Sequence, residues 1–339
     1  MRQVWITRAG APDVLQVREA PDPVALPGQV RVRVRAAGIN FADLMARMGL
    51  YPDAPKPPCV VGYEVSGTVD QIGEGVTALA VGDRVFAMPH FGGYSDTVVL
   101  PAAQAIGMPE RMTFEHAAAM PVVYLTAHHA LHYTGNLREG ARVLIHSAAG
   151  GVGLAAVQLA KARKCVIFGT ASASKLDFLR GLGVQHPIDT TTDWAAAVRA
   201  VVGGDAGGLD LVLDPVGGAS WKTGYDLLGP TGRLVAFGFS AATGGNTRSL
   251  LRAAAAFLKI SKYSPMAMMG DNKSVTGINM GQLFERIDIL RPQFDALLAM
   301  YAQGIIEPHV DRTFRFDEAP AAHQHLHDRK ARGKVLLVP

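Results

Sequence analysis

One segment, residues 143–153, constrains the fold of this chain more than any other. It reads VLIHSAAGGVG and is followed at once by the apolar run LAAVQLA. A strand that enters a glycine cluster and then a helix lets the backbone approach a pyrophosphate and points helix N-terminal N–H groups at it. A tight strand–helix turn would also need small residues, but it does not explain the second apolar strand that follows at residues 165–169. We therefore expect a dinucleotide site, with the pyrophosphate held by Ala149, Gly150, Gly151, Val152 and Gly153.

The residues after the second strand indicate which dinucleotide is bound. An NAD site has an Asp or Glu about 20 residues after the glycines, where it binds the ribose 2′-hydroxyl. This chain has FGTASASK at residues 168–175 instead. Hydroxyls and an ammonium can bind a 2′-phosphate, which a carboxylate would repel, so NADPH is favoured over NADH. A serine here could also cap the next helix, and the two uses are compatible. The expected phosphate contacts are Thr170, Ser172, Ser174 and Lys175.

Two later glycine clusters follow apolar strands. They are DPVGG at residues 214–218 and AFGF at residues 236–239. Ligands of open α/β sheets bind at the carboxyl ends of the strands, so Gly217 and Gly238 are further candidates for cofactor contact. Plain turn chemistry would also explain these glycines.

The organisation of the chain changes near residue 121. Before it, short β-like runs are broken by Gly and Pro, and the alternation of QVRVRVR at residues 29–35 predicts a strand with one polar face. After it, apolar strands alternate with alanine-rich helices, which is typical of a parallel sheet covered on both faces. The fold class is therefore α/β. Strands are expected at 142–146, 165–169, 209–214, 233–238, 274–278 and 334–338, and helices at 41–48, 152–162, 174–181 and 291–303.

Length and composition exclude several classes of protein. With 339 residues the chain has room for two domains and a large core. The formal net charge is only +4, and Lys and Arg are scattered, so we expect no nucleic-acid partner. Two distant cysteines, Cys59 and Cys165, indicate a reduced protein. The sequence shows no signal-peptide core and no uncharged run near the roughly 20 residues of a membrane-spanning helix, so we expect a soluble, cytoplasmic protein.

Three segments carry a resemblance to a known family. They are GINFADLMARMGLY at residues 38–51, AAGGVG at 148–153 and GKVLLVP at 333–339. With them the chain resembles the medium-chain dehydrogenase/reductase superfamily, in its zinc-free quinone oxidoreductase branch. Matches at residues 169–175, 186–189 and 308–311 resemble the vesicle amine transport protein subgroup. The resemblance implies a GroES-like domain from residues 1–122 and 291–339, a Rossmann NADP-binding domain at residues 123–290, and a cleft where NADPH reduces quinones or activated alkenes.

The resemblance also implies roles for particular residues. It places Asn40 and Asp43 at the nicotinamide end and Tyr51 at the border of the substrate cleft. It places Thr126 near the nicotinamide, and Arg329 resembles a tail arginine that approaches the cofactor. Tyr63 is a candidate hydrogen-bond donor to the substrate, because it stands where zinc-dependent relatives have a histidine ligand; a ring packed beneath the cleft is the alternative. Quinone reductases of bacterial type have a Tyr where this chain has Met45, a difference that bears on specificity for small quinones. They commonly have a second Tyr, facing the 2′-phosphate, where this chain has Thr190, and this difference leaves Lys175 as the main phosphate anchor.

The sequence predicts no metal site. Zinc-dependent relatives have a Cys near the position of Asn40 and a His–Glu pair where this chain has Gly62, Tyr63 and Glu64. Two cysteines in total cannot form a four-thiolate zinc lobe. The alternating triplet His323, His325 and His327 is spread around its predicted helix by the i, i+2 spacing, so we expect a solvated surface there.

The expected function is NADPH-dependent, metal-free reduction of quinones. One alternative is reduction of enones or enoyl thioesters, for which a Met-rich segment at residues 266–280 could line an adaptable apolar pocket. Another is an NADPH-binding interaction protein or a lipid-associated protein with little turnover. The apolar run at residues 250–258 is expected to pack in the core. The resemblance further implies a homodimer, formed through an edge strand such as residues 274–278.

Overall fold

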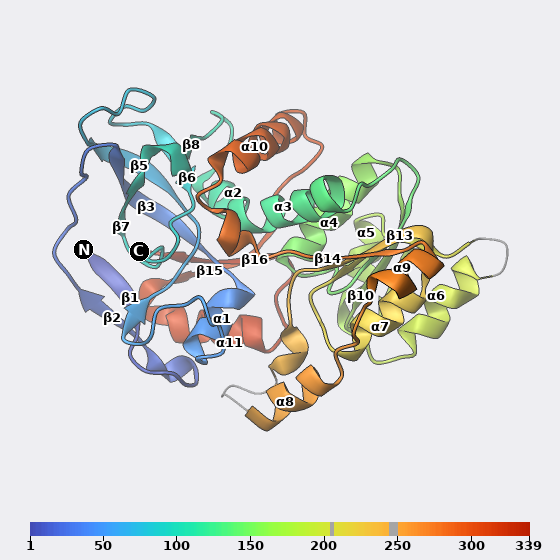
Figure 1. The fold of residues 1–339 in the computed structure, drawn as a ribbon. Coiled ribbons are helices and arrows are strands. Elements are labelled where there is room, and N and C mark those ends of the chain that lie inside the picture. The colour runs from blue at the N-terminus through green and yellow to red at the C-terminus, as the bar shows by residue number, and fades with distance from the viewer. Residues whose placement is uncertain (204–206, 244–249) are drawn as a thin grey trace. The chain divides into compact units, whose positions relative to one another are not determined.

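The chain forms two compact units (Figure 1). The computed structural model describes residues 1–203, 207–243 and 250–339, with the side chains of 250–253 left out. The first unit contains Met1–Leu125 and Met280–Pro339, and the second contains residues 126–243 and 250–279. Both ends of the sequence therefore belong to the first unit. The domain borders expected at 122/123 and 290/291 stay predictions.

The first unit is built around β3 (Gln29–Ile39), the strand that the alternating sequence predicts. Its valines are buried. Arg33, which lies between two of these valines, and Arg35, which follows the last of them, are exposed. One side of β3 pairs with β5, and the other pairs first with β7 and then with β16, all antiparallel. Figure 1 shows the red β16 next to the blue β3. The strands are β1 (Arg2–Ile6), β2 (Leu15–Glu19), β3, β4 (Cys59–Val60), β5 (Val65–Ile72), β6 (Arg84–Ala87), β7 (Thr97–Pro101), β8 (Ala105–Gly107), β15 (Val310–Arg315) and β16 (Lys334–Val338).

Short helices accompany these sheets. The main core of the first unit combines valines of β3 with residues of α1, α11 and β16, so the tail of the chain is part of the core. The helix expected at residues 41–48 is α1 (Phe41–Arg47), and the one expected at 291–303 begins earlier, in α10 (Ile287–Ala302). The others are α2 (Phe114–Ala118), α11 (Ala319–His327) and α3 (Pro121–His128), which crosses from the first unit to the second.

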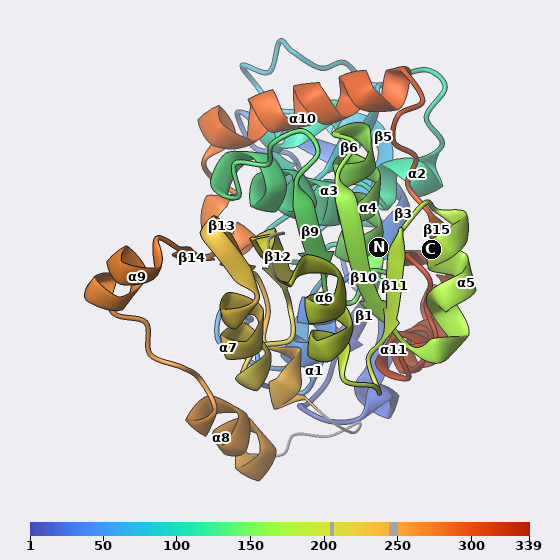
Figure 2. The ribbon, with the colours of Figure 1, turned by 90° about the vertical axis from the view of Figure 1, so that its right-hand side faces the viewer.

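The second unit is a six-stranded parallel sheet with the order β11-β10-β9-β12-β13-β14. In sequence order this is 3-2-1-4-5-6, the doubly wound arrangement of dinucleotide-binding folds. The expected fold class is thus confirmed. Figure 2 shows α6 and α7 in front of the sheet and α4 behind it. The strands are β9 (Arg142–Ile145), β10 (Val166–Ala171), β11 (His186–Asp189), β12 (Leu209–Asp214), β13 (Leu228–Ala236) and β14 (Ser274–Gly277), and the helices are α4 (Gly151–Ala162), α5 (Leu176–Gly181), α6 (Trp194–Val202), α7 (Ala219–Asp226), α8 (Leu250–Leu258) and α9 (Pro265–Asp271).

The expectation that residues 250–258 pack in the core is wrong for the part whose side chains are described. Phe257 is 62% exposed and Leu258 is 88% exposed, and only Ala256 is buried. Over residues 254–258 the helix buries one side chain and leaves the other four in solvent.

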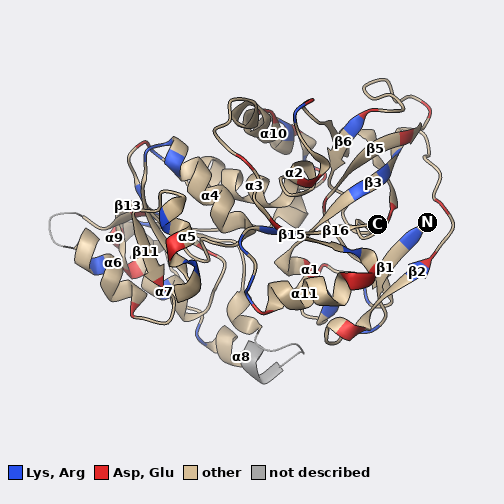
Figure 3. Ribbon diagram, turned by 180° about the vertical axis from the view of Figure 1, so that it is seen from behind, with Lys and Arg blue, Asp and Glu red and all other residues tan. Residues whose placement is uncertain are grey.

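Charged residues of both signs are interleaved in both units (Figure 3). Among the residues that the structure describes, no helix is long and apolar enough to cross a bilayer.

Candidate active site

A buried group of polar side chains surrounds Asn40 in the first unit. The Nζ atom of Lys334 lies 2.5 Å from Oε1 of Glu64 and donates to Oδ1 of Asn40 at 2.6 Å and to the Ile39 carbonyl at 2.7 Å. Nδ2 of Asn40 donates to Oε1 of Glu64 at 2.8 Å. The second carboxylate oxygen of Glu64 accepts the backbone N–H of Val122 at 2.7 Å. These bonds fix the orientation of the Asn40 amide.

Asp43 holds two backbone segments of this site together. It is fully buried, and its carboxylate accepts the backbone N–H of Asn40 at 2.7 Å and that of Gly62 at 3.0 Å. Burial raises the pKa of Asp43 to about 7, against the opposing effects of the Asn40 N–H, the Lys334 charge and the Tyr94 hydroxyl. Asp43 therefore shapes the loops that carry Asn40 and Tyr63, and its carboxylate also interacts with the Tyr94 hydroxyl.

Tyr63 is a buried ring among other aromatic rings. Its centroid lies 5.3 Å from that of Phe91, 6.3 Å from that of Tyr51 and 6.4 Å from that of Phe284. The residue is 4% exposed, and within the described chain its hydroxyl has no hydrogen-bond partner. Burial raises the pKa of Tyr63 well above its ordinary range, so the phenol keeps its proton. The Tyr63 side chain therefore combines the packed ring with a free donor, and Tyr51 lies beside it.

The residues near Asn40 do not fit zinc. Tetrahedral zinc needs thiolate, imidazole or carboxylate ligands that are free to coordinate. Here Asn40 and Tyr63 supply an amide and a protonated phenol, and Glu64 is bound to Lys334 and to the backbone. Over the described ranges, no three His, Cys, Asp or Glu side chains are grouped as metal ligands would be.

The glycine turn of the second unit has the shape that a phosphate site requires. Gly150 precedes α4, and a Cβ added at Gly153 would lie 2.3 Å from the Ser147 carbonyl oxygen. Ser147 has a φ of 55°, in the left-handed region. Ala149 is buried, while Gly150, Gly151 and Val152 are partly exposed, so the backbone at the start of α4 is open to a ligand.

Thr170 supports this turn from the end of β10. It is fully buried, and its hydroxyl lies 3.1 Å from Nδ1 of His146 and accepts the Ser147 N–H at 3.3 Å. Its carbonyl accepts the Ala148 N–H at 2.9 Å. The Thr170 hydroxyl is therefore used within the fold, and its contact with a phosphate stays a prediction.

The other predicted phosphate contacts lie just beyond Thr170. Ser172 and Ser174 are exposed, with their hydroxyls 3.4 Å apart. Lys175 keeps only 9% of its surface exposed. Thr126 is also nearly buried, whereas Arg329 is exposed. The roles predicted for these residues are untested by the structure.

Two further turns lie at the carboxyl ends of β12 and β13. Gly217 has a φ of 81°, and Asp214 accepts its N–H at 3.1 Å and the Ser220 hydroxyl at 2.6 Å. A Cβ added at Gly238 would lie 2.9 Å from the Pro215 carbonyl. Both glycines are thus required by turn geometry, and contact with a cofactor stays a prediction.

The expectation of a solvated histidine triplet is wrong for His323. This side chain is fully buried on α11, with Nε2 3.2 Å from the Tyr94 hydroxyl. His325 lies 2.7 Å from Asp311. The face of α11 that carries His323 packs against the core of the first unit, and burial holds the pKa of His323 well below its usual range.

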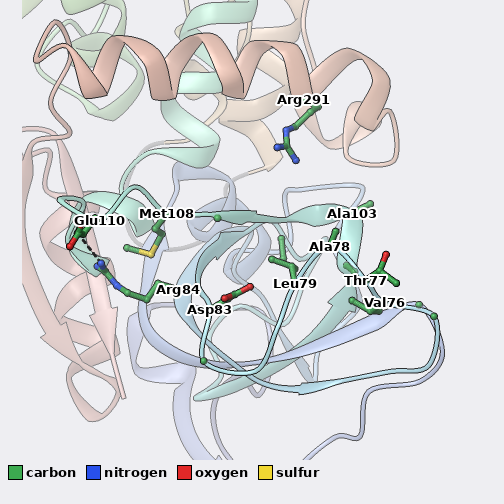
Figure 4. A pocket seen from close by; sticks show the side chains of 16 residues that line it. Val76, Thr77, Ala78, Leu79, Asp83, Arg84, Ala103, Met108, Glu110 and Arg291 are labelled. Atoms are coloured by element: carbon green, nitrogen blue, oxygen red, sulfur yellow. Dashed lines mark hydrogen bonds between the residues drawn. The ribbon is translucent and has the colours of Figure 1, made fainter.

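A cavity of about 860 Å³ lies elsewhere in the first unit (Figure 4). Its walls are the loop from Gly75 to Arg84, residues near Met108, and Arg291 of α10. Arg84 is held by the Glu110 carbonyl at 3.0 Å, and Arg291 by Asp295 at 3.0 Å. None of the predicted site residues lines this cavity.

Comparison with known proteins identifies the family. The chain matches "Alcohol dehydrogenase GroES-like domain" over residues 26–110 and "Zinc-binding dehydrogenase" over residues 182–337. The synaptic vesicle membrane protein VAT-1 homolog of Rattus norvegicus is 42% identical over 327 residues, which cover 96% of this chain and 80% of that protein. The chain belongs to the medium-chain dehydrogenase/reductase superfamily. The resemblance predicted from the sequence, with its GroES-like and Rossmann parts, is confirmed.

Solved structures of the superfamily agree with this assignment. The quinone oxidoreductase of Escherichia coli, complexed with NADPH, has a TM-score of 0.88 at 28% identity, with all of both chains covered. CurK enoyl reductase has a TM-score of 0.85 at 27% identity, with 99% of this chain and 98% of that chain covered. NADP(H)-binding oxidoreductases are thus among the family members similar to this chain.

Sequence reasoning missed several residues of the site. In the sequence, Lys334 is only the first residue of the expected strand at 334–338, and nothing near it indicates that it reaches Asn40, 294 positions earlier. Glu64 stands out only because it lies where zinc-dependent relatives have a His–Glu pair. Both are charged residues in apolar strand surroundings, which is the one signal that could have singled them out.

Proposed function

We propose that this protein is an NADPH-dependent, metal-free reductase of quinones. The proposal rests on the Tyr63 hydroxyl, a buried donor without a partner in the described chain, in the unit that also holds the fixed Asn40 amide. A buried donor that lacks an acceptor costs free energy, and a ligand oxygen would remove that cost. Uncharged donors with fixed positions suit an oxygen that gains negative charge during reaction.

The cofactor would be held by the second unit. The turn that contains Gly150, Gly151 and Gly153 would hold the pyrophosphate at the start of α4, and the first N–H groups of this helix would bind the phosphate oxygens. Ser172, Ser174 and Lys175 are the proposed contacts of the 2′-phosphate. NADPH, when bound, supplies a hydride.

The first unit would stabilise the reduced substrate. A quinone that accepts a hydride develops negative charge on its oxygen, and Tyr63 and Asn40 would donate hydrogen bonds to that oxygen. Tyr51 and Phe91 offer apolar surface around Tyr63 for a flat ring. A hydroquinone anion is stable enough to take its proton from water, so no side chain has to act as an acid.

Reduction of enones or enoyl thioesters is the second candidate, supported by the similarity to CurK enoyl reductase. Hydride addition to the β-carbon of an enone also places negative charge on a carbonyl oxygen, so the same donors would serve. A non-catalytic NADPH-binding or lipid-associated role is the third candidate. The similarity to the rat vesicle protein supports it.

The test is NADPH oxidation by the purified protein, without added metal, against ortho-quinones, para-quinones, enones and enoyl thioesters, with NADH as control. Turnover of quinones supports the proposal, and turnover restricted to enones or enoyl thioesters supports the second candidate. Binding of NADPH without turnover on any of these, together with co-sedimentation with liposomes, would favour the third.

We also propose a homodimer formed through β14. This strand ends the sheet order of the second unit, and it pairs with β13 along one side only in the part of the chain described. An unpaired strand edge is a ready surface for a second copy. Light scattering that gives only monomer at micromolar concentration would contradict this proposal.

A further inference from the structure

Lys334 is a buried cation whose role the proposed chemistry leaves open. It begins β16, in the tail segment GKVLLVP, and it is 3% exposed. An ammonium has three donors and no acceptor. All three find oxygens: the Glu64 carboxylate at 2.5 Å, the Asn40 amide at 2.6 Å and the Ile39 carbonyl at 2.7 Å. The ammonium therefore has a single well-defined position.

The Asn40 side chain has one donor left after these bonds are counted. Oδ1 accepts from Lys334, and one of the two Nδ2–H groups donates to Glu64. An amide of this kind has two N–H donors, so one remains for a ligand. Asn40 is 8% exposed, whereas Glu64 is fully buried, so the free donor of the group belongs to Asn40.

The ammonium also changes the chemistry of that donor. A positive charge 2.6 Å from Oδ1 draws electron density from the amide and makes its N–H groups stronger donors. The effect is larger in a buried site, where the effective dielectric constant is low. Glu64 balances the charge of the ammonium and is itself fixed by the Val122 N–H. Gly38 leaves room for this carboxylate, because a Cβ there would lie 2.5 Å from Oε1 of Glu64.

We propose that Lys334 is a positioning residue, which orients and polarises the Asn40 amide so that its free Nδ2–H stabilises negative charge on a substrate oxygen. This inference rests on the proposed function, since it names the group that strengthens the donor. A purely structural ion pair between Lys334 and Glu64 is the competing explanation. That explanation predicts that replacing Lys334 lowers the stability of the protein, and that any effect of this replacement on kcat does not depend on Asn40.

A double-mutant cycle separates the two explanations. We compare Lys334→Gln, which removes the charge but keeps N–H donors, with Asn40→Ala and with the double variant. The matched control is Lys164→Gln, whose lysine forms an exposed pair with Glu139 at 2.8 Å. We expect Lys334→Gln to lower kcat about tenfold with unchanged NADPH affinity, and to cause no further loss in the Asn40→Ala background. If the kcat losses of the two single variants multiply in the double variant, the proposal is overturned.

A second measurement needs no turnover. 4-Nitrophenol changes its absorbance when it ionises, and its anion resembles a reduced quinone oxygen. In the NADP⁺-loaded protein we expect its ionisation midpoint to lie at lower pH for the wild type than for Lys334→Gln or Asn40→Ala. Equal midpoints in all three, or no binding to the wild type, would overturn the role of Lys334. A wild type that binds the anion through Asn40 but reduces no quinone or enone would contradict the proposed function alone.

Discussion

The Tyr94 hydroxyl lies 3.2 Å from Nε2 of His323, and both side chains are fully buried. Their rings are nearly perpendicular, with centroids 5.8 Å apart. The contact joins the segment before β7 to α11, across 229 positions of the sequence. Burial raises the pKa of Tyr94 well above its usual range, so the hydroxyl keeps its proton and can donate.

Replacing Tyr94 should therefore destabilise the first unit. We expect Tyr94→Phe to lower the free energy of unfolding by about 1–3 kcal/mol, because a buried imidazole nitrogen loses its partner. Urea unfolding measures this as a shift in midpoint with an unchanged slope. The control is Tyr133→Phe, at a ring that is 60% exposed, which should leave the midpoint unchanged. Equal midpoints for the two variants would contradict the prediction.

Arg47 should be replaceable without loss of stability. It is fully buried on α1, and within the described chain none of its guanidinium nitrogens has a hydrogen-bond partner. Burial lowers the pKa of Arg47 to about 10, which reflects the cost of its charge. We expect Arg47→Met to keep or raise the urea midpoint. Arg180→Met, at an exposed pair with Asp177, is the control. A clear fall in the midpoint for Arg47→Met, with none for the control, would contradict this prediction.

Asp43 should make stability depend on pH. Its ordinary pKa is 3.8, and burial raises the pKa in the folded protein to about 7. Between these values the folded state binds one more proton than the unfolded state, so the contribution of Asp43 is fully present below pH 3.8 and is lost as the pH rises through 7.

The variant Asp43→Asn removes this dependence. The difference in unfolding free energy between wild type and variant should shrink as the pH rises from 4 to 7, by at most about 1.4 kcal/mol per pH unit. The variant should also be less stable at every pH, because one amide oxygen replaces two carboxylate oxygens that accept backbone N–H groups. Urea titrations across this range measure both effects. A constant difference would mean that Asp43 is ionised in the folded protein.

Gly153→Ala should damage the phosphate turn. The new methyl group would lie 2.3 Å from the Ser147 carbonyl, so the backbone of the turn must shift. We expect NADPH affinity to fall at least about tenfold, because a loss of about 1.4 kcal/mol of binding free energy corresponds to a tenfold weaker affinity. Gly181→Ala is the matched control, because an added Cβ meets nothing within 4 Å there. Calorimetric titration with NADPH distinguishes the two, and equal affinities would place the pyrophosphate elsewhere.

Lys175→Ala should weaken the binding of NADPH more than the binding of NADH. A charge-assisted hydrogen bond to the 2′-phosphate is worth about 1.5–3 kcal/mol, so NADPH affinity should fall at least about tenfold while NADH affinity changes little. Lys164→Ala, at an exposed lysine, controls for the general loss of positive charge. Equal losses for the two cofactors would mean that Lys175 does not contact the phosphate.

The sequence predicts the second unit better than the first for a physical reason. A strand, a glycine turn and a helix in succession can be recognised from neighbouring residues alone, and β12 of the second unit has the bounds that the sequence predicts. The Asn40 group instead depends on β16 pairing with β3, a contact between residues about 300 positions apart. Periodicity cannot reveal such pairing. The i, i+2 spacing of the histidines also did not indicate that the face of α11 that carries His323 is buried, because spacing alone does not say which face of a helix meets the core.

The position of β16 has a consequence for the order of folding during synthesis. This strand lies between β15 and β3 in the sheet of the first unit, and it leaves the ribosome only after the whole second unit has been made. The parallel sheet can therefore form while the end of β3 is paired with β5 on one side and still lacks β16 on the other. Asn40 meets the Lys334 ammonium only after β16 has been translated, so the candidate site in the first unit is completed after the second unit has been made.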